Sequence, residues 1–224
     1  MNFKLSSEQE LIKQTASNFA KEELAPEVVK RDQNKIWPKE QVSQMAKLGF
    51  MGMMVDEKYG GSGLDTISYC IAMEEISKVD ASAGVIMSVN NSLVCYLIQK
   101  FGSDYLKSTH LPYLASGSKL GAFSLSEPQS GSDASNMNTY AKIDGDSYVI
   151  NGTKNWVTNG VSCDYVLLFA VTKKGVGHKG ISCFLIEKSF KGFTTGKPEE
   201  KLGIRSSDTC ELYFDNVVVP KQNL

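Results

Sequence analysis

The sequence predicts an α+β fold, in which an N-terminal all-α helical domain over residues 1–116 is followed by an antiparallel β-barrel-like domain over residues 117–224. Apolar residues recur at helical spacing as far as Leu114. The composition changes near Gly117, and short strand-like runs separated by turn residues follow. A run of helices followed by a run of strands is typical of the α+β class.

The helical half opens with a capping box at Ser7-x-x-Glu10, and Pro26 is expected to end or kink this first helix near Leu24. A second helix is expected over residues 37–49, followed by a buried connector in which methionines fill the core. The apolar pattern then predicts three further helices, over Thr66–Val79, Ser82–Phe101 and Ser103–Leu114.

The second half carries turn signals at Asp144-Gly145-Asp146 and at Asn151-Gly152, which predict tight turns between strands. The runs that these and other glycine-rich turns separate are rich in β-branched and aromatic residues. They lie at Leu120–Leu125, Thr139–Ile143, Tyr148–Ile150, Tyr165–Val171, Ile181–Ile186 and Glu211–Val219.

Composition excludes several classes of function. The net charge of −1 gives no electrostatic reason to expect nucleic acid or an anionic membrane as a partner. No run approaches the roughly 18 apolar residues that span a bilayer, and residues 1–4 lack the features of a signal or transit peptide, so a cytoplasmic protein is expected. Five scattered cysteines predict reduced thiols, and two histidines are too few to suggest a metal site.

Two glycine-rich loops resemble nucleotide-binding motifs but lack their context. The loop Tyr59–Asp65 has three glycines without the lysine of a P-loop, so it predicts a tight turn before a helix. The loop Gly175–Gly180 matches G-x-G-x-x-G, with Glu199 about 20 residues further on. A strand pattern, Ile181–Ile186, follows the glycines where a dinucleotide fold needs a helix. We therefore interpret Gly175–Gly180 as a hairpin loop.

Two polar stretches are the candidates for a binding site, Gly121–Asp133 (GAFSLSEPQSGSD) and Asn151–Asn159 (NGTKNWVTN). The first predicts a strand that runs into a loop rich in N–H and hydroxyl groups. The second places an aromatic ring, Trp156, and a hydroxyl, Thr158, two positions apart on a short strand. A planar heteroaromatic ring with a phosphate tail would fit such a surface, but a plain β-hairpin with polar loops explains the spacing equally well.

The segment FSLSEPQSGSD resembles the signature of the acyl-CoA dehydrogenase family, and TKNWVTNG resembles its second flavin-contact segment. The resemblance extends over the whole chain, from LSSEQELIK and the Tyr59–Gly63 loop to KLGIRSSDT and DNVVVPKQNL, and is strongest to the short-chain, butyryl-CoA type. It implies FAD as cofactor, a short-chain acyl-CoA as substrate, electron-transfer flavoprotein as redox partner and a homo-oligomer when the enzyme is intact.

The resemblance also implies roles for individual residues. Ser126 would bond the pyrimidine side of the isoalloxazine ring, Trp156 would shield one flavin face, and Thr158 would approach N5, the atom that receives the hydride. Leu125 would supply backbone contacts, and Ser132 would touch the FAD pyrophosphate or the acyl-CoA substrate. The full cofactor-binding set is Phe123, Ser124, Leu125, Ser126, Glu127, Gly131, Ser132, Trp156, Val157 and Thr158.

Two departures from the family pattern matter. Gln129 stands where the family usually has glycine, and Ser130 where it has another small residue, so a positive φ at Gln129 would be strained. Family members also continue beyond the position of Leu224 into a second helical domain that supplies the catalytic glutamate. No catalytic residue is therefore assigned in this chain, which is expected to be inactive alone, and Glu127 is interpreted as structural.

Two alternatives remain open at this stage. One is an acyl-CoA oxidase, and the other is a catalytically silent module that binds flavin, acyl-CoA or another protein. The polar stretch Met87–Ser92 inside a predicted helix also has two interpretations. It is either a solvated face or, as the resemblance implies, a segment near the acyl end of the substrate pocket.

Overall fold

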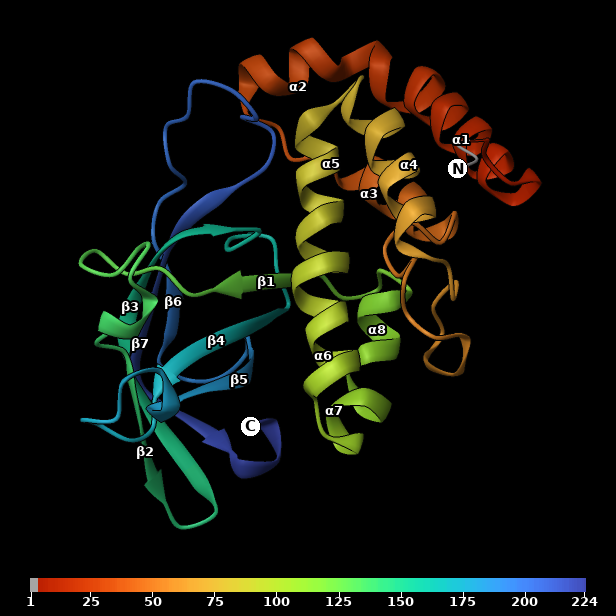
Figure 1. Ribbon diagram of the computed structural model, residues 1–224. Coiled ribbons are helices and arrows are strands. Elements are labelled where there is room, and N and C mark those ends of the chain that lie inside the picture. The colour runs from red at the N-terminus through yellow and green to blue at the C-terminus, as the bar shows by residue number, and fades with distance from the viewer. Residues whose placement is uncertain (1–3) are drawn as a thin grey trace.

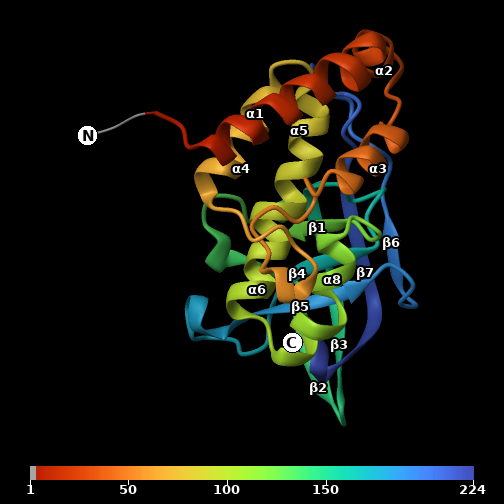
Figure 2. The same ribbon diagram turned by 90° about the vertical axis from the view of Figure 1, so that its right-hand side faces the viewer.

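The computed structural model describes residues 4–224 and confirms the predicted fold class. A helical half is followed by a curled, mixed β-sheet, and the long helix that contains α5 and α6 lies against the sheet (Figures 1 and 2). The expectation about targeting signals rests partly on residues 1–3, which lie outside the described residues.

The first helix begins differently from the prediction, and its regular α-helical geometry is interrupted before Pro26, as expected. Helix α1, Ser7–Phe19, is capped one residue earlier than expected: the Ser6 hydroxyl accepts from Gln9 N at 3.2 Å, and the Gln9 side chain accepts from Ser6 N at 3.0 Å. Pro26 does not end the helical path. A π-helical turn (Ala20–Leu24) and a 3₁₀ turn (Ala25–Glu27) carry the chain directly into α2, Val28–Asn34. Proline is tolerated there because the first N–H groups of a turn need no partner.

The remaining helices follow the predicted order. Helix α3 covers Lys39–Lys47, and α4 covers Thr66–Ser77 with the Asp65 side chain as its N-cap. Helix α5 (Ala81–Ser88), a π-helical segment (Val89–Cys95) and α6 (Tyr96–Phe101) form one continuous path, as predicted for 82–101. The helix predicted over Ser103–Leu114 is divided at His110 into α7, Asp104–Thr109, and α8, Leu111–Ala115.

The Ala81–Phe101 helix is long and apolar enough to cross a membrane, with a mean hydropathy of 1.5. However, 61% of its apolar window is buried inside the protein. It is therefore the core helix of this fold, and Figure 1 shows it between the sheet and helices α3 and α4.

The strands form one curled sheet in the order β1-β4-β2-β3-β7-β6, with β5 on the other edge of β4. β1 and β2 follow one another along the same edge of β4 and are parallel to it, whereas the other pairings are antiparallel. β6 was not expected from the sequence. The strands are β1 (Gly121–Ser124), β2 (Tyr140–Asp144), β3 (Ser147–Thr158), β4 (Tyr165–Val171), β5 (Ile181–Glu187), β6 (Phe193–Thr195) and β7 (Thr209–Pro220).

One predicted turn is wrong and two predicted loops are confirmed. Asn151-Gly152 lies inside β3, where a Cβ on Gly152 would come within 2.3 Å of Thr139 Oγ1. Because it has no side chain, Gly152 allows the backbone of β3 to pass close to Thr139. The β2–β3 turn is at Gly145, with φ +54°, as Asp144-Gly145-Asp146 predicted. Gly175–Gly180 joins the antiparallel strands β4 and β5, which confirms a hairpin loop.

The polar stretch in the core helix is not a solvated face, because Asn90 and Asn91 are fully buried and hydrogen-bonded. Asn90 Nδ2 donates to Met51 O at 2.8 Å and to Leu114 O at 3.1 Å, and its Oδ1 accepts from Gly121 N at 2.9 Å. Asn91 likewise bonds the connector that carries Met53. These amides join the helix to the methionine connector and to the first strand.

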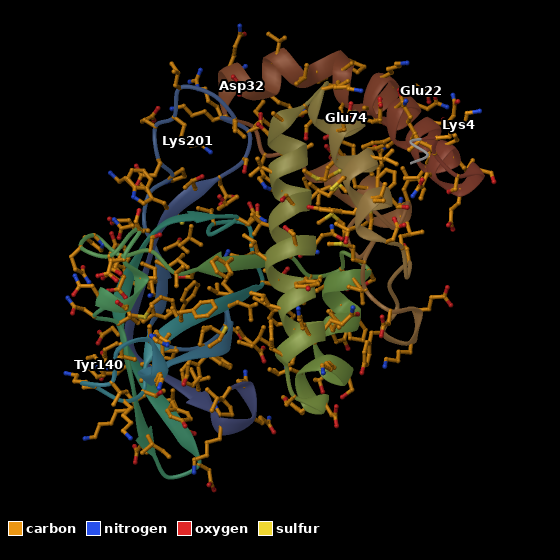
Figure 3. All side chains as sticks on the ribbon, in the orientation of Figure 1. Lys4, Glu22, Asp32, Glu74, Tyr140 and Lys201 are labelled. Atoms are coloured by element: carbon orange, nitrogen blue, oxygen red, sulfur yellow. The ribbon has the colours of Figure 1, made fainter. Side chains whose placement is uncertain are left out.

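The two halves also meet at the far end of the molecule. The loop between β6 and β7 reaches α2, where Arg205 N donates to Asp32 Oδ1 at 2.8 Å. Asp32 and Lys201 are labelled on the two sides of this contact in Figure 3. One apolar cluster contains residues of both halves, among them Ile98, Leu114, Leu167 and Leu185. The helices and the sheet therefore share part of one core.

Candidate functional site

The fold brings the two polar stretches side by side at the end of β1. Asn155 N, on β3, donates to Ser126 O at 2.8 Å, and the neighbouring Lys154 donates from Nζ to Leu125 O at 2.8 Å. Segments almost 30 residues apart in the sequence thus lie side by side.

A buried ion pair lies directly beneath this surface. The Lys154 and Glu127 side chains are 0% and 2% exposed, and Lys154 Nζ is 2.8 Å from Glu127 Oε1. The Glu127 carboxylate also accepts from Thr139 N at 3.0 Å, from Asn138 N at 2.6 Å and from Gln129 Nε2 at 2.7 Å. Its lone pairs are directed at protein donors, so the carboxylate is structural.

Electrostatics agree with this role. Burial alone would raise the pKa of the Glu127 carboxyl, but hydrogen bonds from Lys154, Thr139 and Asn138 outweigh burial and lower the pKa from 4.5 to about 2. Burial lowers the pKa of Lys154, and Glu127 opposes that shift. Glu127 is ionised at neutral pH and is a very weak base.

The β3 strand is irregular where it presents Trp156. Between Lys154 and Val157 the strand has one residue more than its partner β7, a β-bulge. Trp156 has φ +60°, in the left-handed region, and is 66% exposed. The hydroxyls of the half-buried Ser126 and Thr158 have no hydrogen-bond partner within residues 4–224. An exposed aromatic ring beside two unpaired hydroxyls fits a planar heteroaromatic ligand such as a flavin.

Not every residue of the predicted cofactor set presents its side chain to this surface. Ser124, Glu127 and Val157 are buried, so only their backbone could meet a ligand. Phe123 is half-buried and packs against Phe169, with ring centroids 5.3 Å apart. That the backbone groups of these residues contact a cofactor stays a prediction.

The loop after Glu127 is less strained than the family pattern suggested. Glu127 and Ser130 exchange backbone hydrogen bonds of 2.8 and 3.0 Å across a tight turn. Gln129 lies in this turn and is absent from the residues with positive φ in the described chain. The expected backbone strain does not arise, and the Gln129 amide instead bonds Glu127. Gly131 and Ser132 are exposed beyond the turn, where a phosphate-bearing ligand would have access.

Sequence reasoning missed Lys154 and Asn155 as parts of the site. A lysine between Thr153 and Asn155 gives no sign of complete burial, because lysine is almost always exposed unless it is paired. The one available signal was the acidic Glu127 in the other polar stretch. Burial of both charges requires their pairing, which only the three-dimensional register reveals.

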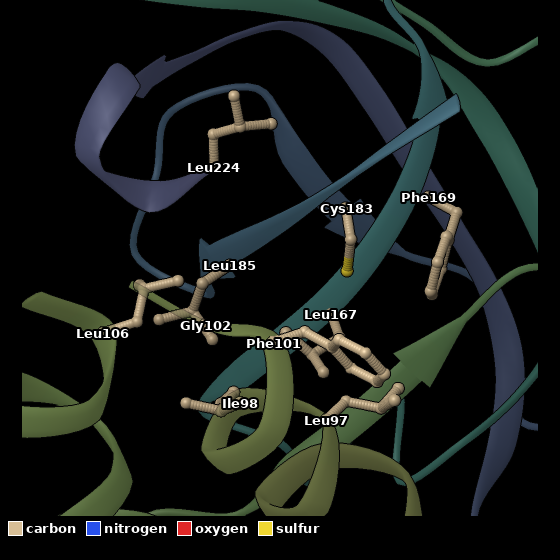
Figure 4. Close-up of a pocket in the computed structure, with 10 residues that line it drawn as sticks. All are labelled: Leu97, Ile98, Phe101, Gly102, Leu106, Leu167, Phe169, Cys183, Leu185 and Leu224. Carbon is tan, nitrogen blue, oxygen red and sulfur yellow. The ribbon is translucent and has the colours of Figure 1, made fainter. Parts of the chain in front are cut away.

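An apolar cavity of about 280 Å³ lies between α6 and strands β4 and β5 (Figure 4). Leu97, Phe101, Leu167, Phe169 and Cys183 are among its lining residues. It could accept an aliphatic chain, but no charged or hydroxyl side chain lines it to orient one. We assign it no ligand.

Metal and thiol chemistry find no support in the described part of the chain. Within residues 4–224, no group of three or more His, Cys, Asp or Glu side chains is placed to hold a metal ion. The five cysteines are free, and four of them are buried or half-buried.

Comparison with known proteins identifies the family. The family model of the acyl-CoA dehydrogenase N-terminal domain matches residues 6–118, and that of the middle domain matches residues 122–217. The chain belongs to the acyl-CoA dehydrogenase family. The predicted boundary between residues 116 and 117 itself stays a prediction.

Within the family, the chain is similar to short-chain enzymes. It is 46% identical to the short-chain specific acyl-CoA dehydrogenase of Clostridium acetobutylicum, over 100% of this chain and 59% of that protein. A chain in a solved structure of the electron transferring flavoprotein of Acidaminococcus fermentans is 44% identical, with a TM-score of 0.98, and the match covers 100% of this chain and 59% of that one.

A third relative was solved with a bound flavin. The glutaryl-CoA dehydrogenase of Mycobacterium smegmatis in complex with FADH2 is 34% identical, with a TM-score of 0.91. The match covers 98% of this chain and 55% of that one. The chain therefore spans little more than half the length of these relatives.

Proposed function

We propose that this chain is the N-terminal and middle portion of a flavin-dependent dehydrogenase that oxidises short-chain acyl-CoA thioesters between Cα and Cβ. The observation that carries the proposal is the surface formed by Ser126, Trp156 and Thr158 at the joined polar stretches. The whole-length similarity to a short-chain specific relative supports the substrate class. The FADH2 complex of the Mycobacterium relative supports FAD as the cofactor.

The residues would act by binding and orientation. The exposed Trp156 ring would stack on one face of the flavin and exclude water from it. The unpaired hydroxyls of Ser126 and Thr158 would donate to polar atoms at the ring edge, where donors stabilise the charge that develops on reduction. The exposed Ser132 would contact the pyrophosphate or the acyl-CoA. When bound, the flavin supplies the hydride acceptor that these side chains lack.

No base for the α-proton is assigned within residues 4–224. Glu127 is the acidic residue of the predicted site, and its carboxylate has a pKa of about 2 and is occupied by Lys154 and three other donors. A positioned base contributes roughly 10²–10⁴-fold to rate. We therefore propose that these 224 residues alone do not turn over acyl-CoA.

The wider biological context belongs to the same proposal. Electron-transfer flavoprotein is the proposed redox partner, which the similarity to a chain in the Acidaminococcus flavoprotein structure supports. A homo-oligomer of the intact enzyme and a cytoplasmic location complete the proposal, and the free cysteines are consistent with a reducing compartment.

Titration of the purified chain with FAD, followed by flavin fluorescence, tests the cofactor site. Trp156→Ala and Thr158→Ala are expected to weaken binding, whereas Tyr113→Ala, which removes an exposed ring on α8, leaves it unchanged. Equal titration curves for all four proteins would reject the assigned site. A series of acyl-CoA lengths assayed on the intact enzyme should give an optimum near four carbons, since each methylene changes the preference by only ~1–3 kcal/mol.

The second candidate is a catalytically silent flavin- or acyl-CoA-binding module, which the fully hydrogen-bonded carboxylate of Glu127 favours. An acyl-CoA oxidase is the third, and it differs in how rapidly O₂ reoxidises the reduced flavin. Anaerobic mixing of FAD-loaded chain with butyryl-CoA should leave the flavin absorbance unchanged. Rapid bleaching would show that a base lies within the chain, and Glu127→Gln would then be the first variant to examine.

A further inference from the structure

We propose that the buried Glu127–Lys154 pair is a positioning device that fixes the spacing of the two flavin-contact segments, an inference that rests on the proposed function. Lys154 Nζ bonds Leu125 O and Glu127 Oε1, both in the first segment, while its own backbone belongs to the second. The ammonium group therefore bridges the two segments from below. The backbone bond from Asn155 N to Ser126 O continues the same connection at the surface.

The carboxylate extends the connection to a third segment. Glu127 accepts from the N–H groups of Asn138 and Thr139, immediately before β2. Its turn with Ser130 directs the exposed Gly131–Ser132 loop. One ion pair thus orders the strand end, the loop and the bulged strand that carry the predicted contacts.

Burial of a charge pair is a poor way to gain stability, because apolar residues of similar volume often serve as well or better. Directional bonds instead specify one arrangement of the groups they join. Here they specify where the extra residue of β3 falls, because Lys154 is the last residue in register with β7 before the bulge. Trp156 follows with a left-handed backbone conformation, which persists only where the surrounding structure holds it. We infer that the pair provides this support and so sets the orientation of the Trp156 ring.

The helical half offers a matched control. Arg31 and Asp80 form a second buried ion pair, with Nη2 and Oδ2 3.0 Å apart and side chains 5% and 3% exposed. Arg31 also donates to a backbone carbonyl, Leu24 O, as Lys154 does to Leu125 O. This pair has the same chemistry but contacts neither flavin-contact segment.

The experiment uses the whole chain with Trp37→Phe, so that Trp156 is the single tryptophan. Two properties are measured in Lys154→Met, Glu127→Gln and the control Arg31→Met: acrylamide quenching of Trp156 without cofactor, and the Kd for FAD. Both site variants should change the quenching constant and weaken FAD binding at least tenfold. Arg31→Met should lower the Tm and leave both properties unchanged.

Glu127→Gln keeps the shape of the side chain but removes its charge and replaces one accepting oxygen with an NH2 donor, so it tests the pair even if Lys154→Met fails to fold. The inference is overturned if the quenching of Trp156 is unaltered in Glu127→Gln. It is also overturned if Arg31→Met alters the quenching equally, because the effect would then be merely structural. If the parent chain binds no FAD, the proposed function fails for this chain. The quenching data alone then decide whether the pair positions Trp156.

Discussion

Asn90→Ala tests whether the buried amides hold the two halves of the molecule together. The side chain is fully buried and bonds Met51 O, Leu114 O and Gly121 N, with a longer contact of 3.7 Å to Cys95 Sγ. A typical hydrogen bond contributes about 1 kcal/mol, and a buried group left without a partner costs about 1–3 kcal/mol. Truncation removes these bonds and leaves Gly121 N without its acceptor, although Leu114 O keeps its bond from Gly117 N, so the expected loss is roughly 3–5 kcal/mol.

Urea denaturation followed by circular dichroism measures the free energy of unfolding. For a chain of this size, 1 kcal/mol shifts the Tm by about 2–4 °C, so Asn90→Ala should melt roughly 6–20 °C below the parent. Asn34→Ala is the matched control, because that amide is exposed and bonds only Lys30 O, at 2.8 Å. Its effect should lie within about 0.5 kcal/mol.

Asn90→Asp separates hydrogen bonding from packing. A carboxylate could still accept from Gly121 N, but it would face the carbonyl oxygens of Met51 and Leu114 without a proton to donate. It should therefore destabilise the protein at least as much as alanine does at neutral pH. A loss below about 1 kcal/mol for either variant would refute the view that these bonds join the halves.

Three other groups give predictions of their own. The folded-state pKa of Glu127 is lowered from 4.5 to about 2, so its ionised form contributes ~3 kcal/mol to the free energy of unfolding above pH 4.5. This contribution is lost as the pH falls toward 2. Denaturation curves measured after pH jumps should show this acid transition in the parent chain and not in Glu127→Gln. Gly152→Ala should lower stability by about 2–4 kcal/mol, because its Cβ would meet Thr139 Oγ1 at 2.3 Å; an unchanged Tm would contradict this contact. Ellman's reagent should label Cys70 rapidly in the native chain, and the other thiols only on unfolding, since they are buried or half-buried. Burial raises the pKa of the thiols of Cys95, Cys163, Cys183 and Cys210.

Periodicity predicted the elements whose apolar faces repeat regularly, and it failed where single residues decide. The pattern of 82–101 predicted the core helix, and Tyr165–Val171 predicted β4 to the residue. Periodicity could not distinguish Ser6 from Ser7 as the helix cap, because both are followed by suitable side chains three residues later. Asn-Gly usually marks a turn, yet here it lies within β3, because tertiary contact with Thr139 requires the glycine.

The candidate site was only partly accessible to sequence reasoning. The two polar stretches could be recognised by composition, but their adjacency depends on the parallel pairing of β1 with β4 and on the path of β3, which no local pattern encodes. For the same reason the sequence could not show that Lys154 reaches Glu127, or that Ser124 faces inward. Burial of a polar side chain is decided by its distant neighbours.

The amide junction between helix and sheet has a consequence for motion. Gly121, the first residue of the sheet, is bonded from both sides: its N–H donates to Asn90, and its carbonyl accepts from Asn159 Nδ2 at 3.1 Å. Hinged closure of one domain over another needs a few backbone positions that are free to change φ and ψ. The crossing point is hydrogen-bonded on both sides of Gly121, so we expect no hinge there. We therefore expect the helices and the sheet to move as one rigid body.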